Sequence, residues 1–321
     1  MVLFADSVTL VGPTASGKTA AAIEVARMYE GIDIVSVDSM TVYREMNVGT
    51  AKPSAAEIAG VSYRLLNVAS VSEEFSLWDF LGLCKELDSE LKAKGRRPLL
   101  VGGTALYLKA VLDDLTPPGR SEGMRTWLEQ RLTDEQAAMR LYRLLSQLDP
   151  ASAEKIDENN SRRIVRSLEV MLATGRPFSS FGPGVAEVSS IDRCIVGIKP
   201  PREVIRRRIS ERISEQMEAG WLPEAQGLFQ HRESMSKTAL QALGYKELFD
   251  HLSGLITLDE AIEKIIHRTW RFAKRQLAWF DRDPRIIWSQ SQDEAVEVIS
   301  AILGNSRQFS VTPKIEDGTN W

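Results

Sequence analysis

The sequence predicts an α/β fold in which a parallel sheet is interrupted by an all-helical insertion. Short apolar strand patterns alternate with helical patterns in the N-terminal part of the chain, as they do in parallel sheets. From Met124 to about Thr174 only helical patterns follow one another. The segment "RCIVGIKP" (Arg193–Pro200) then has the composition of a buried strand, which predicts that the chain returns to the sheet.

Pro- and Gly-rich stretches mark the expected boundaries of the insertion, at "LTPPGRSEGM" and "GRPFSSFGPG". We expect residues 1–116 and 188–304 to form the core, residues 117–187 the insertion, and the polar residues 305–321 a flexible tail. Helices are expected to continue to about Gly304. The remaining expected elements are strands at Ser7–Val11, Asp33–Val37 and Pro98–Val101 and helices at Lys18–Tyr29, at Leu77–Lys94 and from Ala105.

Composition excludes several classes of protein. Hydrophobic residues make up 43% and charged residues 26%, which is ordinary for a globular chain without a membrane-spanning segment. The two cysteines and three histidines lack the spacing of a disulfide framework or a zinc site, so we expect a cytoplasmic protein. The net charge of −4 does not favour nucleic-acid binding overall, although local basic stretches matter more for phosphate contacts.

One stretch carries a strong chemical signal. "GPTASGKT" follows an apolar strand, precedes a helix and matches G-x-x-x-x-G-K-[ST] at every fixed position, which predicts a core like that of P-loop NTPases. Backbone N–H groups of such a loop surround phosphate oxygens, the lysine adds positive charge, and the hydroxyl of Thr19 can ligate Mg²⁺. The motif indicates a polyphosphate and a metal without naming the nucleotide. The residues expected to bind phosphate are Gly12, Pro13, Thr14, Ala15, Ser16, Gly17, Lys18 and Thr19.

An acidic residue is expected at the mouth of the same sheet. Asp38 follows the strand "DIVSV", where ligands of parallel sheets bind, and could hold magnesium or act as a base. The strand "PLLV" ends in Gly102-Gly103-Thr104 without an acid, which argues against an ATP-driven motor.

Two further regions are rich in basic residues. Arg162, Arg163 and Arg166 lie on a predicted helix of the insertion, where they could close over phosphates, grip an RNA backbone, or pair with Glu158 and Glu169. In "KIIHRTWRFAKRQLAWF" a basic stripe runs beside an apolar stripe. The basic stripe comprises Lys264, Arg268, Arg271 and Arg275, and the apolar stripe Ile262, Ile266, Ala273 and Leu277.

Taken together, these stretches resemble one family, the tRNA dimethylallyltransferases, also called tRNA isopentenyltransferases, in its bacterial form. The matching segments occur in the family's order over residues 7 to about 290. They are "GPTASGKT", "SVDSMTVYREMNVGTAKP", "PLLVGGTALYLKA", "RRIVRSLEV", "GIKPPREVIRRRISERISEQMEAG", "ALGYKEL" and "AKRQLAWF". Thr41 and Ala278 depart from the residues common in the family, Gln and Thr, which bears on tRNA recognition more than on the chemistry.

The resemblance implies prenyl transfer to RNA. The loop would hold the diphosphate of dimethylallyl diphosphate with Mg²⁺ on Thr19, and ATP would not be consumed. Lys18 and Arg212 would stabilise the leaving diphosphate, and Asp38 would accept the proton from the amino group of the adenosine 3′ of the anticodon. The residues that would contact the tRNA anticodon stem-loop are Asp38, Ser39, Met40, Thr41, Thr104, Arg125, Arg162, Arg163, Ile164, Val165, Arg166, Gln241, Gly244, Tyr245 and Lys246.

The protein is expected to act as a monomer. Three alternatives remain open at this point: an isopentenyltransferase acting on a free adenine nucleotide, a small-molecule P-loop kinase with an arginine lid, and a non-catalytic RNA-binding protein. The basic helices argue against the first, since a free nucleotide needs no RNA-sized surface. Intact Lys18, Thr19 and Asp38 argue against the third. ATP binding and hydrolysis would identify the second.

Overall fold

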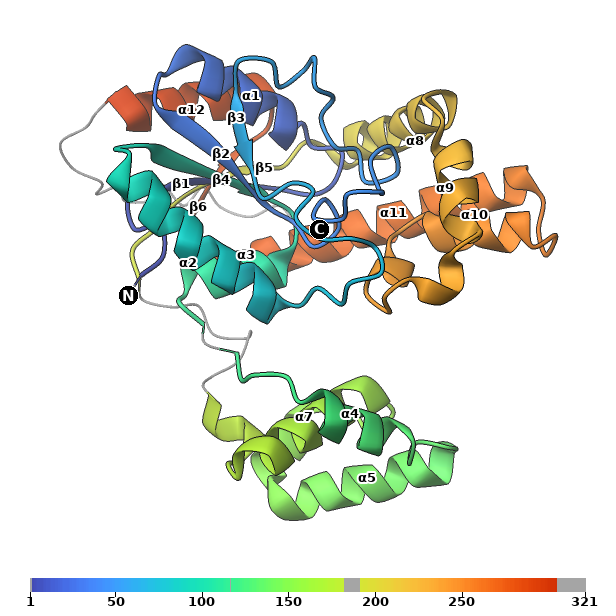
Figure 1. The fold of residues 1–321 in the computed structure, drawn as a ribbon. Coiled ribbons are helices and arrows are strands. Elements are labelled where there is room, and N and C mark those ends of the chain that lie inside the picture. Colours follow the sequence, from blue (N-terminus) through green and yellow to red (C-terminus); the bar gives the residue numbers. More distant parts are fainter. Residues whose placement is uncertain (1, 116, 182–190, 305–321) are drawn as a thin grey trace. The chain divides into compact units, whose positions relative to one another are not determined.

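The computed structural model of the 321-residue chain describes residues 2–115, 117–181 and 191–304. The chain divides into two compact units, an all-helical unit at Leu115–Ser189 and a core made of the segments on either side of it (Figure 1). The helical unit is two residues longer at each end than the range 117–187 expected from the sequence. The expected tail, residues 305–321, lies outside the described residues.

The core is built on a six-stranded sheet in the order β3-β2-β4-β1-β5-β6, with every neighbouring pair parallel. The predicted α/β fold with a parallel sheet is therefore confirmed. The strands β1 and β2 are buried along their whole length, because helices cover both faces of the sheet. The strands are β1 (Val8–Val11), β2 (Ile32–Val37), β3 (Ser62–Arg64), β4 (Arg97–Gly102), β5 (Cys194–Ile198) and β6 (Ile286–Ser289).

The sequence missed both edge strands. β3 has three residues, none of them buried, so it lacks the apolar run that marks the inner strands. β6 lies within a region that was expected to be helical throughout, and that expectation was wrong: Ile286 pairs with Ile195 of β5. A four-residue strand gives too short a pattern to be separated from the helices around it.

Helices cover the two faces of the sheet. α1 (Lys18–Met28) and α12 (Gln292–Gly304) pack side by side on one face, and α2 (Leu77–Ala93) and α3 (Ala105–Leu112) lie on the other (Figure 1). A capping box between Ser76 and Asp79 begins α2. The carboxyl ends of the strands are left open between these layers, where a ligand can reach them.

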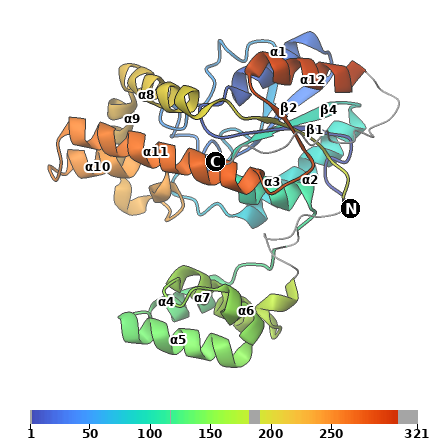
Figure 2. The same cartoon turned by 180° about the vertical axis from the view of Figure 1, so that it is seen from behind.

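Four helices form a group beside the sheet: α8 (Arg202–Glu218), α9 (Trp221–Phe229), α10 (Tyr245–Leu252) and α11 (Leu258–Phe280) (Figures 1 and 2). α11 packs on both α8 and α10. Its apolar face was only half predicted. Ala273 and Leu277 are buried as expected, but Ile262 and Ile266 are half-exposed, and the residues preceding them, Ala261 and Ile265, are buried instead.

The helical unit has a core of its own. Its helices are α4 (Glu122–Glu129), α5 (Glu135–Leu148), α6 (Pro150–Lys155) and α7 (Ser161–Thr174). Leu128, Leu145 and Leu168 are fully buried where these helices meet. In the described residues of both units, no helix is long and apolar enough to cross a membrane.

Candidate active site

The loop from Gly12 to Gly17 connects β1 to α1, which begins with Lys18 and Thr19, as the motif predicts. Gly17 lies at the N-cap of α1 with φ of 97°, a left-handed conformation that other residues adopt only with strain. The turn brings the first N–H groups of the helix and the side chains of Lys18 and Thr19 to the carboxyl end of β1. This is the geometry by which a helix N-terminus binds an anion.

Two cationic side chains converge on this loop. Lys18 Nζ donates to the carbonyl oxygen of Pro13 at 2.6 Å, and Arg212 Nη1, from α8, donates to Thr14 Oγ1 at 3.0 Å. Burial and the charge of Arg212 lower the pKa of Lys18 to about 7, although Asp38 acts in the opposite direction. Burial also lowers the pKa of Arg212. A cationic site of this kind favours an anionic ligand.

Asp38 and Thr104 follow neighbouring strands. Val37 of β2 is in register with Gly102 of β4, so the residues after these two strands meet at one edge of the sheet. Thr104 Oγ1 donates to Asp38 Oδ2 at 3.1 Å. Asp38 Oδ1 accepts from the backbone N–H groups of Met40 and Thr41, at 2.8 and 3.2 Å. The carboxylate is thereby held in one orientation.

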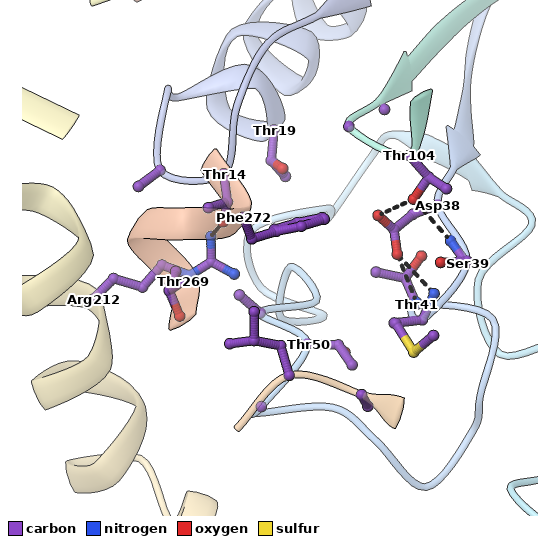
Figure 3. Close-up of a pocket in the computed structure, with 18 of the residues that line it drawn as sticks. Thr14, Thr19, Asp38, Ser39, Thr41, Thr50, Thr104, Arg212, Thr269 and Phe272 are labelled. Atoms are coloured by element: carbon purple, nitrogen blue, oxygen red, sulfur yellow. Dashed lines mark hydrogen bonds between the residues drawn. The ribbon is translucent and has the colours of Figure 1, made fainter. Parts of the chain in front are cut away.

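A single cavity of about 610 Å³ brings the two groups together. Figure 3 shows Arg212 reaching toward Thr14, with Asp38 and Thr104 hydrogen-bonded in another part of the same cavity (Figure 3). The lining is therefore cationic beside the loop and acidic beside β2. The sequence-predicted residues that line the cavity are Thr14, Ala15, Lys18, Thr19, Asp38, Ser39, Met40, Thr41, Thr104, Arg212 and Gln241.

The sequence did not reveal that α11 reaches into this site. Gln276 is buried; its Oε1 accepts from the N–H of Thr14 at 2.8 Å, and its Nε2 donates to the carbonyl oxygen of Gly103 at 2.8 Å. One amide thus joins the phosphate loop to the turn that carries Thr104. The segment "AKRQLAWF" was singled out as one of those that resemble the family, within a longer stretch noted for its basic stripe, but no local pattern marks this glutamine as a bridge.

The basic stripe of α11 is partly directed at the cavity. Arg268, Arg271 and Arg275 line it, whereas Lys264 does not. Arg268 also forms an ion pair with Glu247 of α10, which is almost fully buried. Three arginines at the rim give this part of the site a positive character suited to phosphate groups.

Several residues predicted to contact RNA do not line the cavity, and most of these are buried. Ile164 and Val165 are buried in the core of the helical unit, so their side chains offer no surface. Tyr245 is fully buried and donates its hydroxyl to Glu224 at 2.6 Å. Gly244 is buried as well. Lys246 is exposed and pairs with Asp250.

The arginines of the helical unit divide into two kinds. Arg162 and Arg163 are exposed. Arg166 pairs with Glu169, which is fully buried, at 2.7 Å, and also donates to the carbonyl oxygens of Pro118 and Gly119. Arg125 lies 3.7 Å from the same carboxylate. For Arg166, the ion-pair interpretation left open by the sequence therefore describes its contacts.

We expect Arg166→Ala to lower the free energy of unfolding by about 3 kcal/mol, because the buried carboxylate of Glu169 loses its nearest cation and keeps the N–H of Ser121 and the more distant Arg125. Denaturant unfolding followed by circular dichroism measures the loss. Arg163→Ala is the matched control, since Arg163 is exposed on the same helix, and its stability should stay unchanged. Equal stability of both variants would contradict a structural role for Arg166.

Comparison with known proteins agrees with this geometry. A model of the family described as IPP transferase matches residues 41–283, and a model described as isopentenyl transferase matches residues 6–75. A tRNA dimethylallyltransferase from Geobacillus kaustophilus is 41% identical over 307 residues, covering 94% of this chain and 96% of the relative.

Solved structures give the same result. The full-length tRNA isopentenylpyrophosphate transferase of Bacillus halodurans superimposes with a TM-score of 0.67 at 36% identity, covering 93% of this chain and 95% of that one. A eukaryotic dimethylallyltransferase described as acting on tRNA shares the fold, with a TM-score of 0.77 at 23% identity over 95% of this chain and 81% of that one. The family match, the relatives and the site agree, and the chain belongs to the IPP transferase family.

Proposed function

We propose that this protein transfers a dimethylallyl group from dimethylallyl diphosphate to the exocyclic amino nitrogen of the adenosine 3′ of the anticodon in tRNA. The observation that carries the proposal is the cavity, which joins a phosphate-binding loop with two cations to a carboxylate held by three hydrogen bonds. Such a site can bind a diphosphate ester at one side and an amino group at the other. The reaction is proposed to occur in the cytoplasm, on a monomeric enzyme.

In the proposed reaction the adenine nitrogen attacks the first carbon of the dimethylallyl chain. The bond from that carbon to the diphosphate oxygen breaks, and both of its electrons leave with the oxygen. Lys18, Arg212 and the N–H groups of the loop stabilise the charge that develops there. Asp38 Oδ2 accepts one hydrogen bond, from Thr104, and a carboxylate oxygen has room for a second, so it can take the proton from the nitrogen.

Magnesium is part of the proposal. The described residues contain no group of three His, Cys, Asp or Glu side chains that could hold a metal alone. The hydroxyl of Thr19 lines the cavity, and Mg²⁺ commonly takes one or two protein oxygens, substrate phosphates and water. Thr19 and the diphosphate would therefore hold the ion, which would supply charge stabilisation for the leaving group.

The RNA would be held by exposed basic side chains. Arg162, Arg163 and Lys246 are exposed, and Arg271 and Arg275 lie at the cavity rim. The target base must leave its stack to reach Asp38, which costs a few kcal/mol and is offset by contacts to the flanking backbone. The half-buried ring of Phe272 lines the cavity and offers a face for the flipped base.

A transfer assay tests the proposal. The protein is incubated with Mg²⁺, labelled dimethylallyl diphosphate and either unmodified tRNA, AMP or ADP. Label in tRNA alone is the expected result. Label in AMP or ADP would instead indicate an isopentenyltransferase acting on free nucleotides. No transfer, together with ATP hydrolysis in the presence of an acceptor, would favour a kinase.

A further inference from the structure

A carboxylate remote from the reaction holds one wall of the cavity. Glu224 lies on α9, and it does not line the active-site cavity. Its Oε2 accepts from the N–H groups of Asn47 and Val48 at 2.7 and 2.9 Å, and its Oε1 accepts from the N–H of Gly49 at 3.1 Å. Three successive N–H groups that converge on one anion form a concave binding site, here filled by a side chain of the same protein.

The opposite side of this loop is also held. Gln216 Nε2, from α8, donates to the carbonyl oxygens of Val48 and Gly49, at 2.6 and 3.1 Å. The N–H and C=O groups of these two residues are therefore paired with side chains of two different helices. This leaves the loop backbone little freedom to move away from α8 and α9.

Packing fixes the distance between the loop and the helices. A Cβ atom on Gly49 would lie 2.1 Å from Trp221 Nε1 and 2.5 Å from Tyr245 Oη. Trp221 and Tyr245 are both fully buried, and the tyrosine hydroxyl donates to Glu224. The close approach requires glycine at this position and places the loop directly against the aromatic rings.

The residues that follow this loop segment line the cavity. Thr50, Ala51 and Pro53 line it, and Thr50 is seen there in Figure 3; Ile209 and Phe272 line the same cavity (Figure 3). These five side chains are small or apolar, unlike the charged groups of Lys18 and Asp38. Under the proposed function, an apolar five-carbon chain has to fit beside such side chains, between the diphosphate and the amino group.

We propose that Glu224 is a positioning residue that sets the width of the prenyl end of the cavity, and so the preference for a five-carbon chain over longer prenyl diphosphates. It acts by holding Asn47–Gly49 against α9, without touching the substrate. This inference rests on the proposed function and adds a determinant of substrate length to it.

The experiment compares Glu224→Gln with the unaltered protein, using dimethylallyl diphosphate and geranyl diphosphate as donors and unmodified tRNA as acceptor. The glutamine side chain places an NH₂ group where the carboxylate accepted hydrogen bonds from the N–H groups of residues 47–49. At least one of these hydrogen bonds is lost, so the loop should be held less tightly. We expect the ratio of kcat/KM for the two donors to fall by at least about tenfold, mainly through KM. Glu218→Gln, an exposed change on α8, is the control and should keep the ratio.

Other outcomes overturn the inference. A folded Glu224→Gln variant with an unchanged ratio, or with equal losses for both donors, would mean that Glu224 supports only the fold. If that variant fails to fold, Tyr245→Phe removes the hydroxyl that donates to Glu224 without changing a residue that lines the cavity, and an unchanged ratio there is equally decisive. Absence of transfer by the unaltered protein would instead overturn the proposed function, and this inference with it.

Discussion

Replacing Asp38 with asparagine should lower the rate of prenyl transfer by about 10²–10⁴-fold, the usual contribution of a positioned general base. Asparagine has nearly the same shape and keeps an oxygen that can accept hydrogen bonds, so the turn formed with Met40 and Thr41 should persist. It cannot take the proton from the adenine nitrogen. The affinity for unmodified tRNA should change little.

Single-turnover transfer and tRNA binding have to be measured on the same preparation. Asp293→Asn removes an exposed acid from α12 and serves as the matched control, with an unchanged rate. A parallel loss of tRNA affinity in Asp38→Asn would contradict the assignment, because Asp38 would then serve mainly to bind the adenine and not to accept its proton. Asp38→Glu should keep part of the activity, since the carboxylate remains.

The sequence predicted those parts of the site that are recognisable from a few neighbouring residues in the chain. An apolar strand, a glycine turn and a helix start follow one another from Val8 to Lys18, and each is a short-range signal. Asp38 was found for the same reason, since it directly follows a buried strand. In both cases the strand or helix that positions the side chain is adjacent to that residue in the sequence.

The missed residues act across long sequence separations on backbone atoms. Gln276 binds the N–H of Thr14, 262 residues away, and Glu224 binds the N–H of Asn47, 177 residues away. Backbone groups are the same at every residue, so the sequence contains no complementary side chain that would reveal such a pair. Only the packing of α9 and α11 against the core makes these contacts visible.

The error in α11 has a different cause. A helix buried against one neighbour has a narrow apolar stripe, but α11 packs on α8 and α10 together. Its buried face is therefore wide. Because Ile265 and Ile266 are consecutive, two apolar stripes, one with each isoleucine, fit the helical periodicity almost equally well. The structure selects the one with Ile265 inside. Sequence periodicity alone cannot separate two stripes that share most of their residues.

Replacing Lys18 with alanine should abolish most of the activity while leaving the free protein at least as stable. Burial and Arg212 lower the pKa of Lys18 to about 7, so we expect its ammonium form to be less favoured in the folded protein than in water, despite its hydrogen bond to Pro13. A bound diphosphate would supply the missing negative charge. Losing one such group at a developing anion costs about 10²–10³-fold in rate, and we expect at least the lower figure in kcat/KM.

Thermal unfolding with and without inorganic diphosphate and Mg²⁺ separates the two effects. The unaltered protein should unfold at a higher temperature when diphosphate is present, since a ligand of the folded state stabilises it. Lys18→Ala should lose most of that shift and keep or raise the melting temperature of the free form. Lys85→Ala, an exposed change on α2, should alter neither. A Lys18→Ala variant that melts earlier but keeps the full shift would show that Lys18 supports the fold of the loop more than it binds the diphosphate. A site built to receive an anion should instead become more stable when its cation is removed, because the positive charge is costly until the substrate arrives.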